Sequence, residues 1–391
     1  MRKKGNSVDR SQHDGNPPKY VPAQVLRDQL ILVFRSWGMG EEHINHAVEA
    51  MVAADLWGID SHGISMLMQY EEMFRDGKLE MKSEPRIVRD SAVMALIDGA
   101  KGLGHIVATI AMNMAVDKCL AAGIGVVSVF NSTHFGAAGY YALKAAQRGV
   151  IGIVMTSTRS VLVVPTFGCE PVLGTNPIAF AAPTERNPPF LLDMSTSTVA
   201  SNKVKVYELN NWDLPEGWVV DENGGAVSDP VEARQISKKQ HTGGLTPLGG
   251  TRDLGSHKGY GLSVMVQILA STLAGASFSP IRNNSQEKTE PENIGHFFLA
   301  IDPKAFRVPG AFENDLDQII DILHSSQPVE SGQPVLVAGD PESQTCEKRH
   351  HEGIPIPEKL MHQLRKVAER SSVPFLLNDA KDSVESDGVM S

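Results

Sequence analysis

Between residues 93 and 147 the chain alternates short apolar runs with longer alanine-rich runs, and this alternation limits the possible folds more than any other feature. Val93–Ile97 and Val126–Phe130 have the length and β-branched content of buried strands. Ile106–Ala122 and Tyr140–Gln147 have the length and composition of helices. Strands that alternate with helices are typical of α/β proteins. We therefore predict the α/β class.

The rest of the chain supplies further helices and strands. Apolar residues at helical spacing predict two helices between residues 21 and 56, separated at Gly38–Gly40, and a third helix over Ile64–Phe74. The apolar stretch Tyr260–Phe278 contains polar side chains and glycines, so we expect a buried helix and not a membrane span. The remaining strands are predicted at Gly152–Met155, Val161–Val164, Pro189–Leu192 and Phe297–Ile301, with a helix at Phe312–Ser325. Residues 203–250 and 279–293 are polar and rich in turn-forming residues, which predicts long loops, the first with a small hairpin.

Composition argues against several classes of protein. The 391-residue chain has a formal net charge of -10, which repels nucleic-acid backbones, so we expect no nucleic-acid partner. Its three widely spaced cysteines support neither a disulfide framework nor a thiolate zinc site, so we expect a cytoplasmic protein without a metal. We expect no secretory signal and no membrane association. Polar, turn-rich ends predict a disordered tail over residues 1–20 and a mobile tail over residues 371–391.

The common nucleotide-binding and hydrolytic motifs are missing. Gly102-Leu-Gly104 and Gly123-Ile-Gly125 are the nearest matches to the GxGxxG fingerprint, and neither has the third glycine. The sequence also lacks GxxxxGK[ST], HExxH and GxSxG. On motifs alone, a Rossmann dehydrogenase would be rejected.

The first candidate site is Asp60-Ser61-His62-Gly63, at a junction between a loop and a helix. A neutral imidazole there can give or take a proton near pH 7. The same residues also fit a simple helix cap, in which Asp60 or Ser61 accepts backbone N–H bonds.

The second candidate site is the turn Asn131–Tyr141, which contains His134-Phe135-Gly136. Small residues at the start of a helix allow a ligand to approach the backbone N–H groups closely. An ordinary strand-turn-helix corner with a capping Thr133 fits the same letters.

Two more polar clusters complete the set of candidate sites. Leu173-Gly-Thr175-Asn176-Pro177 is followed by Leu191-Leu-Asp193-Met194-Ser195-Thr196-Ser197, whose acid and hydroxyls suit a ribose or a carboxamide, or a capping box. Gly255-Ser-His257-Lys258-Gly259 opens the apolar helix, where Lys258 would bind a phosphate or remain solvated.

The order of these motifs is more specific than any one of them. The series DSHG, NSTHFGAAGYYA, GTNPIAFAAP, LDMSTSTVA, GSHKGYGL and GHFFLAIDP resembles the type-2 malate/L-lactate dehydrogenase family, which includes ureidoglycolate, sulfolactate and piperideine-2-carboxylate enzymes. The resemblance runs from about residue 21 to 360. It implies a non-Rossmann NAD(P)-binding fold of the sulfolactate dehydrogenase-like type, with a mixed sheet, flanking helices and more than one domain. It also implies a homodimer that binds NAD or NADP and a small-molecule substrate.

The resemblance further implies a division of the chain and a set of site residues. The expected domains are a helix-rich domain formed by residues 21–125 and 255–365, and a cofactor-binding domain formed by residues 126–254. The expected catalytic residues are His62, Ser61 and His134. The expected cofactor contacts are His134, Phe135, Gly136, Asp193, Met194, Ser195, Thr196, Ser197, His257, Lys258, Gly339 and Asp340. Thr175, Asn176 and position 66 are expected beside the substrate.

Position 66 departs from the family pattern. Relatives commonly carry an arginine there that clamps the substrate carboxylate, whereas this chain has Met66. Either another cation, Arg159 or Lys258, takes that part, or the substrate is not a simple 2-oxo acid. We predict an NAD(P)-dependent dehydrogenase of small 2-hydroxy acids. The alternatives are a member that binds cofactor with an altered substrate or without turnover, and a zinc hydrolase that uses His62, His134 and Asp193.

Overall fold

The computed structural model describes residues 18–239, 241–285 and 290–378. The helices are α1 (Ala23–Ser36), α2 (Glu41–Leu56), α3 (Leu67–Arg75), α4 (Gly104–Ala122), α5 (Ala138–Ala146), α6 (Ser201–Asn210), α7 (Pro230–Lys239), α8 (His257–Gln267), α9 (Ser279–Ser285), α10 (Ala311–Ser325), α11 (Asp340–Glu352) and α12 (Glu358–Arg370). The strands are β1 (Lys19–Val21), β2 (Arg86–Asp90), β3 (Met94–Asp98), β4 (Ile124–Ser132), β5 (Ile151–Thr156), β6 (Ile178–Ala182), β7 (Phe190–Met194), β8 (Val219–Val220), β9 (Gly244–Leu245), β10 (Ile294–Ile301) and β11 (Ile354–Ile356).

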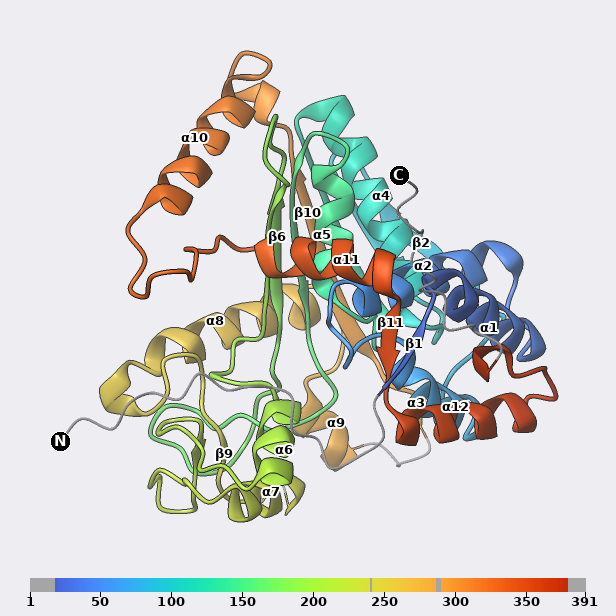
Figure 1. The fold of residues 1–391 in the computed structure, drawn as a ribbon. Coiled ribbons are helices and arrows are strands. Elements are labelled where there is room, and N and C mark those ends of the chain that lie inside the picture. The colour runs from blue at the N-terminus through green and yellow to red at the C-terminus, as the bar shows by residue number, and fades with distance from the viewer. Residues whose placement is uncertain (1–17, 240, 286–289, 379–391) are drawn as a thin grey trace, which may run out of the picture.

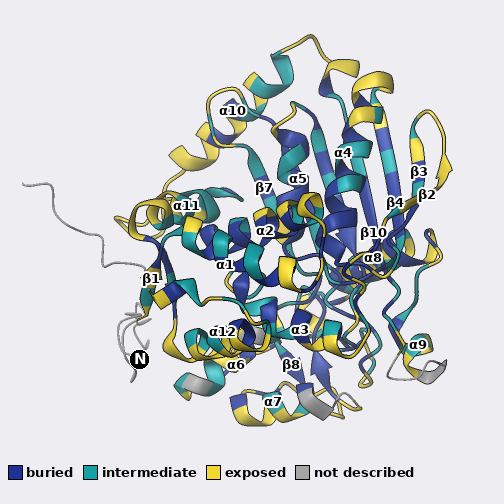
Figure 2. Cartoon of the chain, turned by 90° about the vertical axis from the view of Figure 1, so that its right-hand side faces the viewer, coloured by how far each residue is buried: buried dark blue, intermediate teal, exposed yellow. Residues whose placement is uncertain are grey.

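A seven-stranded mixed sheet with flanking helices forms the centre of the molecule, as predicted (Figure 1). Its order is β2-β3-β4-β10-β5-β6-β7, and only the β3–β4 pair is parallel. Helices α4 and α5 pack on strands of this sheet, and α8 continues into a π-helical turn, Ile268–Thr272, which packs against β4, β5 and β10. The central strands β4, β10, β5 and β6 therefore have little contact with water, which explains their apolar runs. Figure 2 shows the buried residues concentrated in these layers.

The register of β10 brings distant segments together at one end of the central strands. Ile294 pairs with Ser132 at the end of β4, and His296 pairs with Thr156 at the end of β5. The loops that follow β4 and β5 therefore start beside the segment that precedes β10. The candidate site lies at this end of the central strands.

A second core lies beside the sheet, where α1, α2, α3 and α12 pack around apolar residues such as Phe34, Met51 and Tyr70. Strands β1 and β11 pair antiparallel next to it and connect the two ends of the described chain. The strongly amphipathic pattern of α12 buries Leu364 and Val367 in this core. Ile64, directly after the DSHG motif, is buried in this core and anchors the segment after α2.

Several expectations about elements need correction. Val161–Val164 is not a strand, although Val163 forms isolated bridges to Leu173 and Leu245. Residues 203–250, predicted as a loop, contain most of α6 and all of α7, and α9 lies within the predicted loop 279–293. These helices were not predicted because their few apolar residues give only a weak helical periodicity. The helix predicted from Ile64 begins with a 3-10 turn, Ile64–Met66.

The predicted tails are too long at their inner ends. Lys19–Val21 pairs with β11, and Leu377 near the other end is fully buried. Residues 1–17 and 379–391 lie outside the described residues. The division into domains stays a prediction, and the central sheet takes strands from both predicted domains.

Among the helices that the structure describes, α4 is long and apolar enough, by length and composition, to cross a membrane. About half of its apolar window, 56%, is buried inside the molecule, where it packs on β4 and α5. Gly125 shows how close this packing is, since a Cβ there would lie 1.9 Å from the carbonyl oxygen of Ala115 on α4. Gly125, the second glycine of Gly123-Ile-Gly125, is therefore required for the close packing of α4 on β4.

Candidate active site

A cavity of about 280 Å³ lies where the ends of β4 and β5 meet the start of β10. Its wall includes Ser61, His62 and Met66 from the segment after α2, and His134, Phe135 and Gly136 from the loop after β4. The end of β5 and the loop after it, residues 156–160, form another side, and Glu292 and Ile294 close the cavity from just before and at the start of β10. The cavity is large enough for a small organic acid together with one ring of a cofactor.

The segment that carries His62 is held by the buried carboxyl group of Asp55. Asp55 at the end of α2 accepts a hydrogen bond from the backbone N–H of Ile64, 2.8 Å away. A Cβ at Gly63 would lie 1.9 Å from an oxygen of Asp55, so a glycine is required for this close approach. Burial raises the pKa of Asp55 to about 8.

His62 and His134 lie next to each other in the cavity wall. Their rings stack with centroids 5.5 Å apart at an angle of 29°. Ser61 Oγ lies 2.8 Å from Nδ1 of His62, and the Tyr70 hydroxyl lies 2.9 Å from Nδ1 of His134. Each imidazole therefore uses Nδ1 within the protein and keeps Nε2 for a ligand.

Both histidines are neutral near pH 7. Burial lowers the pKa of His62. Burial lowers the pKa of His134 well below its usual value, and the nearby His62, His105, His296 and Arg159 add smaller contributions in the same direction. Two neutral imidazoles next to each other can donate a hydrogen bond and accept a proton without either ring being charged in the resting site.

Arg159 brings a positive charge to the cavity wall. Its Nη1 donates to Glu292 Oε1 at 2.7 Å, and Glu292 is buried while the arginine side chain is 47% exposed. A guanidinium has five N–H donors, so the pair with Glu292 orients the group and leaves other donors for a carboxylate. Arg159 is thus better placed than Lys258, which lies exposed at the start of α8 and is not among the cavity residues.

The structure brings most of the predicted catalytic and substrate residues together. Ser61, His62, Met66, His134 and Thr175 all line the cavity. Asn176 does not line it, because its side chain is fully buried and donates to the carbonyl oxygen of Ser263.

The predicted cofactor residues lie in four places. His134, Phe135 and Gly136 belong to the cavity wall. Asp193 and Met194 end β7, and the next residues connect to the cavity because the Thr196 N–H donates to the carbonyl oxygen of Thr175. Ser195 and Ser197 hydrogen-bond to each other beside Thr196, His257 and Lys258 open α8, and Gly339 and Asp340 open α11. Gly339 lies against Leu191 of β7, which places the α11 start beside the β7 segment.

The simple capping alternatives are not what the structure shows at two of these motifs. Asp60 pairs with Arg349 instead of capping the helix after it, and Ser61 contacts His62. Thr133 accepts from the backbone N–H of Gly104 and so supports α4. Asp193 does cap a helix, but it caps α5 from a neighbouring strand by accepting from Gly139 at 2.7 Å.

Sequence reasoning missed several residues of the site. Apart from Arg159, which was a candidate cation, the run Thr156–Ser160 was not singled out, and neither were Tyr70 and Glu292, although all of them position or line the cavity. The run TSTRS directly after the apolar strand 151–155 was a usable signal, because polar residues at a strand end often carry function. Nothing local marked Tyr70 or Glu292, since each acts on residues far away in the sequence.

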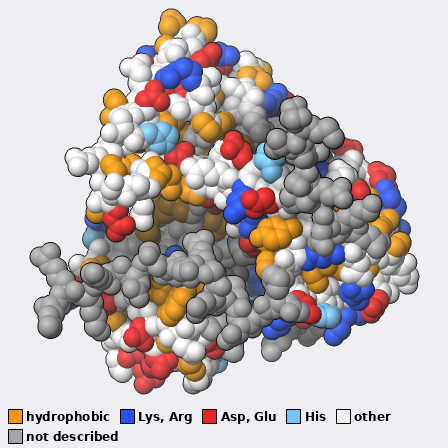
Figure 3. All heavy atoms as spheres, viewed as in Figure 1, with side chains coloured by type: hydrophobic (Ala, Val, Ile, Leu, Met, Phe, Trp, Pro, Cys, Tyr) orange, Lys and Arg blue, Asp and Glu red, His pale blue; other side chains and the backbone are white. Residues whose placement is uncertain are grey.

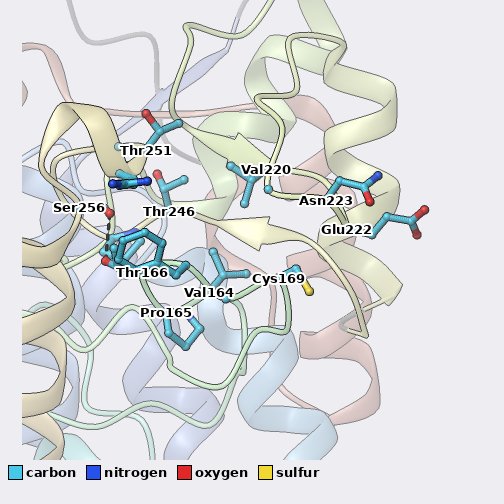
Figure 4. A pocket seen from close by; sticks show the side chains of 16 residues that line it. Val164, Pro165, Thr166, Cys169, Val220, Glu222, Asn223, Thr246, Thr251 and Ser256 are labelled. Carbon is cyan, nitrogen blue, oxygen red and sulfur yellow. Dashed lines mark hydrogen bonds between the residues drawn. The ribbon is translucent and has the colours of Figure 1, made fainter.

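No group of three or more His, Cys, Asp or Glu residues is arranged to hold a metal ion within residues 18–239, 241–285 and 290–378. A second cavity lies near β8 and β9 (Figure 4). In it Thr166 Oγ1 lies 2.9 Å from Ser256 Oγ, and the Arg252 guanidinium lies 4.8 Å from the centre of the Phe167 ring. Its lining residues include none of the predicted catalytic residues.

Known proteins resemble this chain over nearly its whole length. The family described as malate/L-lactate dehydrogenase matches residues 21–365. A malate dehydrogenase from Pyrococcus horikoshii is 40% identical over 357 residues, which cover 91% of this chain and 96% of that protein. A malate dehydrogenase structure from Entamoeba histolytica has a TM-score of 0.86 at 34% identity and covers 92% of this chain and 99% of that chain. The sulfolactate dehydrogenase structure from Methanocaldococcus jannaschii has a TM-score of 0.82 at 31% identity, covering 93% of this chain and 99% of that chain. This chain belongs to the malate/L-lactate dehydrogenase family.

Proposed function

We propose that this oxidoreductase transfers a hydride between NAD or NADP and a small 2-hydroxy or 2-oxo acid of the malate or lactate type. The observation that carries the proposal is the pair of neutral imidazoles, His62 and His134, in one cavity with the guanidinium of Arg159. Oxidation of a hydroxy acid needs a group that accepts the hydroxyl proton and a cation that holds the carboxylate. These three side chains supply both.

The two histidines differ in what they can do. Nδ1 of His134 faces the Tyr70 hydroxyl and, at 3.4 Å, the backbone N–H of Gly136. Because that N–H can only donate, Nδ1 accepts and the ring proton of His134 lies on Nε2, where it can donate to a substrate oxygen. His62 has a hydroxyl partner, Ser61, that can accept from Nδ1–H and so leave Nε2 of His62 free to take the hydroxyl proton. His62 is therefore the acid/base and His134 the hydrogen-bond donor.

The cavity wall also fits a nicotinamide nucleotide. Ala200 and Ser201 bring the N-terminus of α6 into the wall, and Thr175 adds a hydroxyl, which together suit a phosphate or a carboxamide. Asp193 to Ser197 approach from β7 through the Thr196–Thr175 hydrogen bond. When bound there, the cofactor supplies or accepts the hydride.

Two features support further parts of the proposal. The three cysteines are all free, which supports a cytoplasmic enzyme.

An apolar groove along α8 is lined by Tyr260, Val264, Met265, Ile268 and Leu269, and Ile268 is 52% exposed. Figure 3 shows apolar side chains gathered in a hollow of the same face, below α10. We expect a second copy of this chain to cover the groove, since large apolar patches seldom stay in water. Light scattering should give the mass of a dimer, and Ile268→Asp should shift it toward the monomer.

The decisive experiment combines a substrate panel with histidine variants. The wild-type enzyme, given NADH or NADPH and a panel of 2-oxo acids, should oxidise one cofactor with at least one acid. His62→Ala should lower kcat by about 10²- to 10⁴-fold and keep the fluorescence-measured affinity for the reduced cofactor. His134→Ala should lose both activity and cofactor affinity, and the exposed His351→Ala serves as the control.

One outcome would favour a different function. Met66 lines the cavity at the position where the family resemblance implies a carboxylate-binding arginine, so a protein with cofactor affinity but altered substrate is the second candidate. Cofactor binding without turnover of any acid in the panel would support that candidate. A His62→Ala enzyme within about threefold of wild type would remove His62 from the acid/base assignment.

A further inference from the structure

The segment before His62 is tied to a helix from the far end of the chain. Arg349 on α11 forms a two-pronged ion pair with Asp60, with 3.1 Å between Nη2 and Oδ2 and a second, shorter contact from Nη1 to Oδ1. Nη1 also donates to the carbonyl oxygen of Asp55 at the end of α2. One guanidinium therefore joins α11, the end of α2 and the residue two positions before His62.

Short-range contacts join Asp60 to the residues around His62, in addition to the hydrogen bond from Ile64 to Asp55. The Ser65 hydroxyl donates to the carbonyl oxygen of Asp60, and the His62 N–H donates to the carbonyl oxygen of Ile59 at 2.9 Å. The imidazole itself is held within the protein by its neighbour Ser61. A shift of Asp60 thus moves Ser61 and His62 together, as one turn of chain.

Helix α11 is itself anchored near the predicted cofactor segment. Its first residues follow Gly339, which lies against Leu191 of β7, and the carbonyl of Ala338 accepts the Leu191 N–H at 3.2 Å. In its middle, Thr345 packs on Gly58, where a Cβ would come within 3.0 Å of the threonine methyl group. In Figure 1, α11 lies across the molecule between the sheet and α2.

Resting on the acid/base function proposed for His62, we propose that Arg349 is a positioning residue that sets the direction of the His62 imidazole through Asp60. Through α11, the same residue ties the His62 segment to the β7 end of the site. A planar guanidinium fixes a carboxylate in both position and angle, which an ammonium group cannot do. A displacement of about 1 Å at a reacting group lowers the rate by about 100-fold, so a small change at Asp60 has a large effect on turnover.

This arrangement should affect catalysis more than stability. The Arg349 side chain is 13% exposed, but Asp60 is 57% exposed, and an ion pair with one partner in water adds little to folding. Arg349→Met should therefore fold, and Asp60→Asn breaks the same pair from its exposed side. The matched control is Arg35→Met, which breaks an exposed pair with Glu41 far from the cavity.

The test measures kcat, KM and the affinity for the reduced cofactor in these variants, with thermal unfolding as a check of folding. We expect Arg349→Met to lower kcat by about 10- to 100-fold while cofactor affinity stays within about twofold. Asp60→Asn should lower kcat in the same way, and the double variant should be no worse than Arg349→Met, because both remove one contact. Arg349→Lys should recover part of the kcat, and Arg35→Met should match wild type.

Two results would overturn the inference. If Arg349→Met and Asp60→Asn keep kcat within about threefold of wild type while His62→Ala is inactive, Arg349 does not position His62. Additive losses in the double variant would show that the two residues act separately. Failure of the proposed function gives a different pattern, an active His62→Ala enzyme, whatever the Arg349 variants do.

Discussion

The hydroxyl of Tyr70 lies 2.9 Å from Nδ1 of His134, and these residues are 64 positions apart in the sequence. Tyr70 is fully buried on α3, and burial raises its pKa, so the hydroxyl keeps its proton. The Gly136 N–H can only donate to Nδ1, and the protonated Tyr70 hydroxyl can donate there as well, so the two contacts together favour the His134 tautomer with hydrogen on Nε2. Tyr70 thus supports the His134 tautomer that can donate into the cavity through Nε2.

Tyr70→Phe should therefore lower turnover without removing a group that touches the substrate. We expect kcat to fall by about tenfold, because loss of one hydrogen bond of about 0.5–1.5 kcal/mol lets the other tautomer become populated. The nitrogen chemical shifts of His134 should change toward a mixture of tautomers. A variant with wild-type kcat and unchanged shifts would show that Gly136 alone sets the tautomer.

Met66→Arg tests whether the cavity still fits a simple 2-oxo acid. A guanidinium at this position in the cavity wall should bind the substrate carboxylate, and we expect KM for malate-like or lactate-like acids to fall by about 10- to 100-fold if wild type uses them poorly. Met66→Leu is the control for loss of the flexible side chain. Loss of a strong wild-type activity would instead mean that the native substrate presents an apolar group to Met66.

Asp55 should make the protein less stable as the pH rises. Its pKa is raised to about 8 in the folded state, whereas an unfolded Asp titrates near pH 4, so the folded state binds the extra proton between these values. Stability is therefore lost as pH rises through this window, by up to about 1.4 kcal/mol per pH unit. Asp55→Asn stays neutral and can still accept from Ile64. Urea unfolding at pH 5 and pH 8 should show a smaller pH-dependent loss in the variant, and parallel pH profiles would contradict this.

His105 and His296 should share an effect of acid but differ at neutral pH. Burial lowers both pKa values to about 3. Below about pH 6.5 the unfolded state therefore binds more protons than the folded state, and the protein becomes less stable as the pH decreases toward 3. His105→Leu and His296→Leu should each make this acid loss shallower.

At pH 7 the two leucine variants should separate. Both ring nitrogens of His105 lack a partner among the described residues, whereas His296 contacts Thr156 at 2.7 Å and Ser132 at 2.8 Å. His296→Leu should cost about 1–3 kcal/mol through the lost hydrogen bonds, and His105→Leu clearly less. Equal losses in chemical denaturation would show that the His105 nitrogens are satisfied in solution.

Local patterns were enough to locate much of the fold. The helices α1, α2, α4 and α10 and the strands β3, β4, β5 and β7 were predicted close to their observed bounds, because each has a clear apolar period or a short run bounded by turn residues. Elements with little apolar contrast were missed, among them β2, whose residues are all exposed, and α11, which has no fully buried residue. Their structure comes from pairing and packing with distant segments.

The sequence by itself determined the α/β class, the family and the pair His62 and His134, because these follow from local periodicity and from the order of short motifs. Only the tertiary structure decided what those groups can do. The Arg159–Glu292 pair joins residues 133 positions apart, and the Arg349–Asp60 pair joins residues 289 positions apart. No local pattern encodes such contacts, since they exist only once β10 has inserted between β4 and β5 and α11 has packed against α2. Directional hydrogen bonds and ion pairs between distant elements then set the tautomers, charges and orientations on which the chemistry depends.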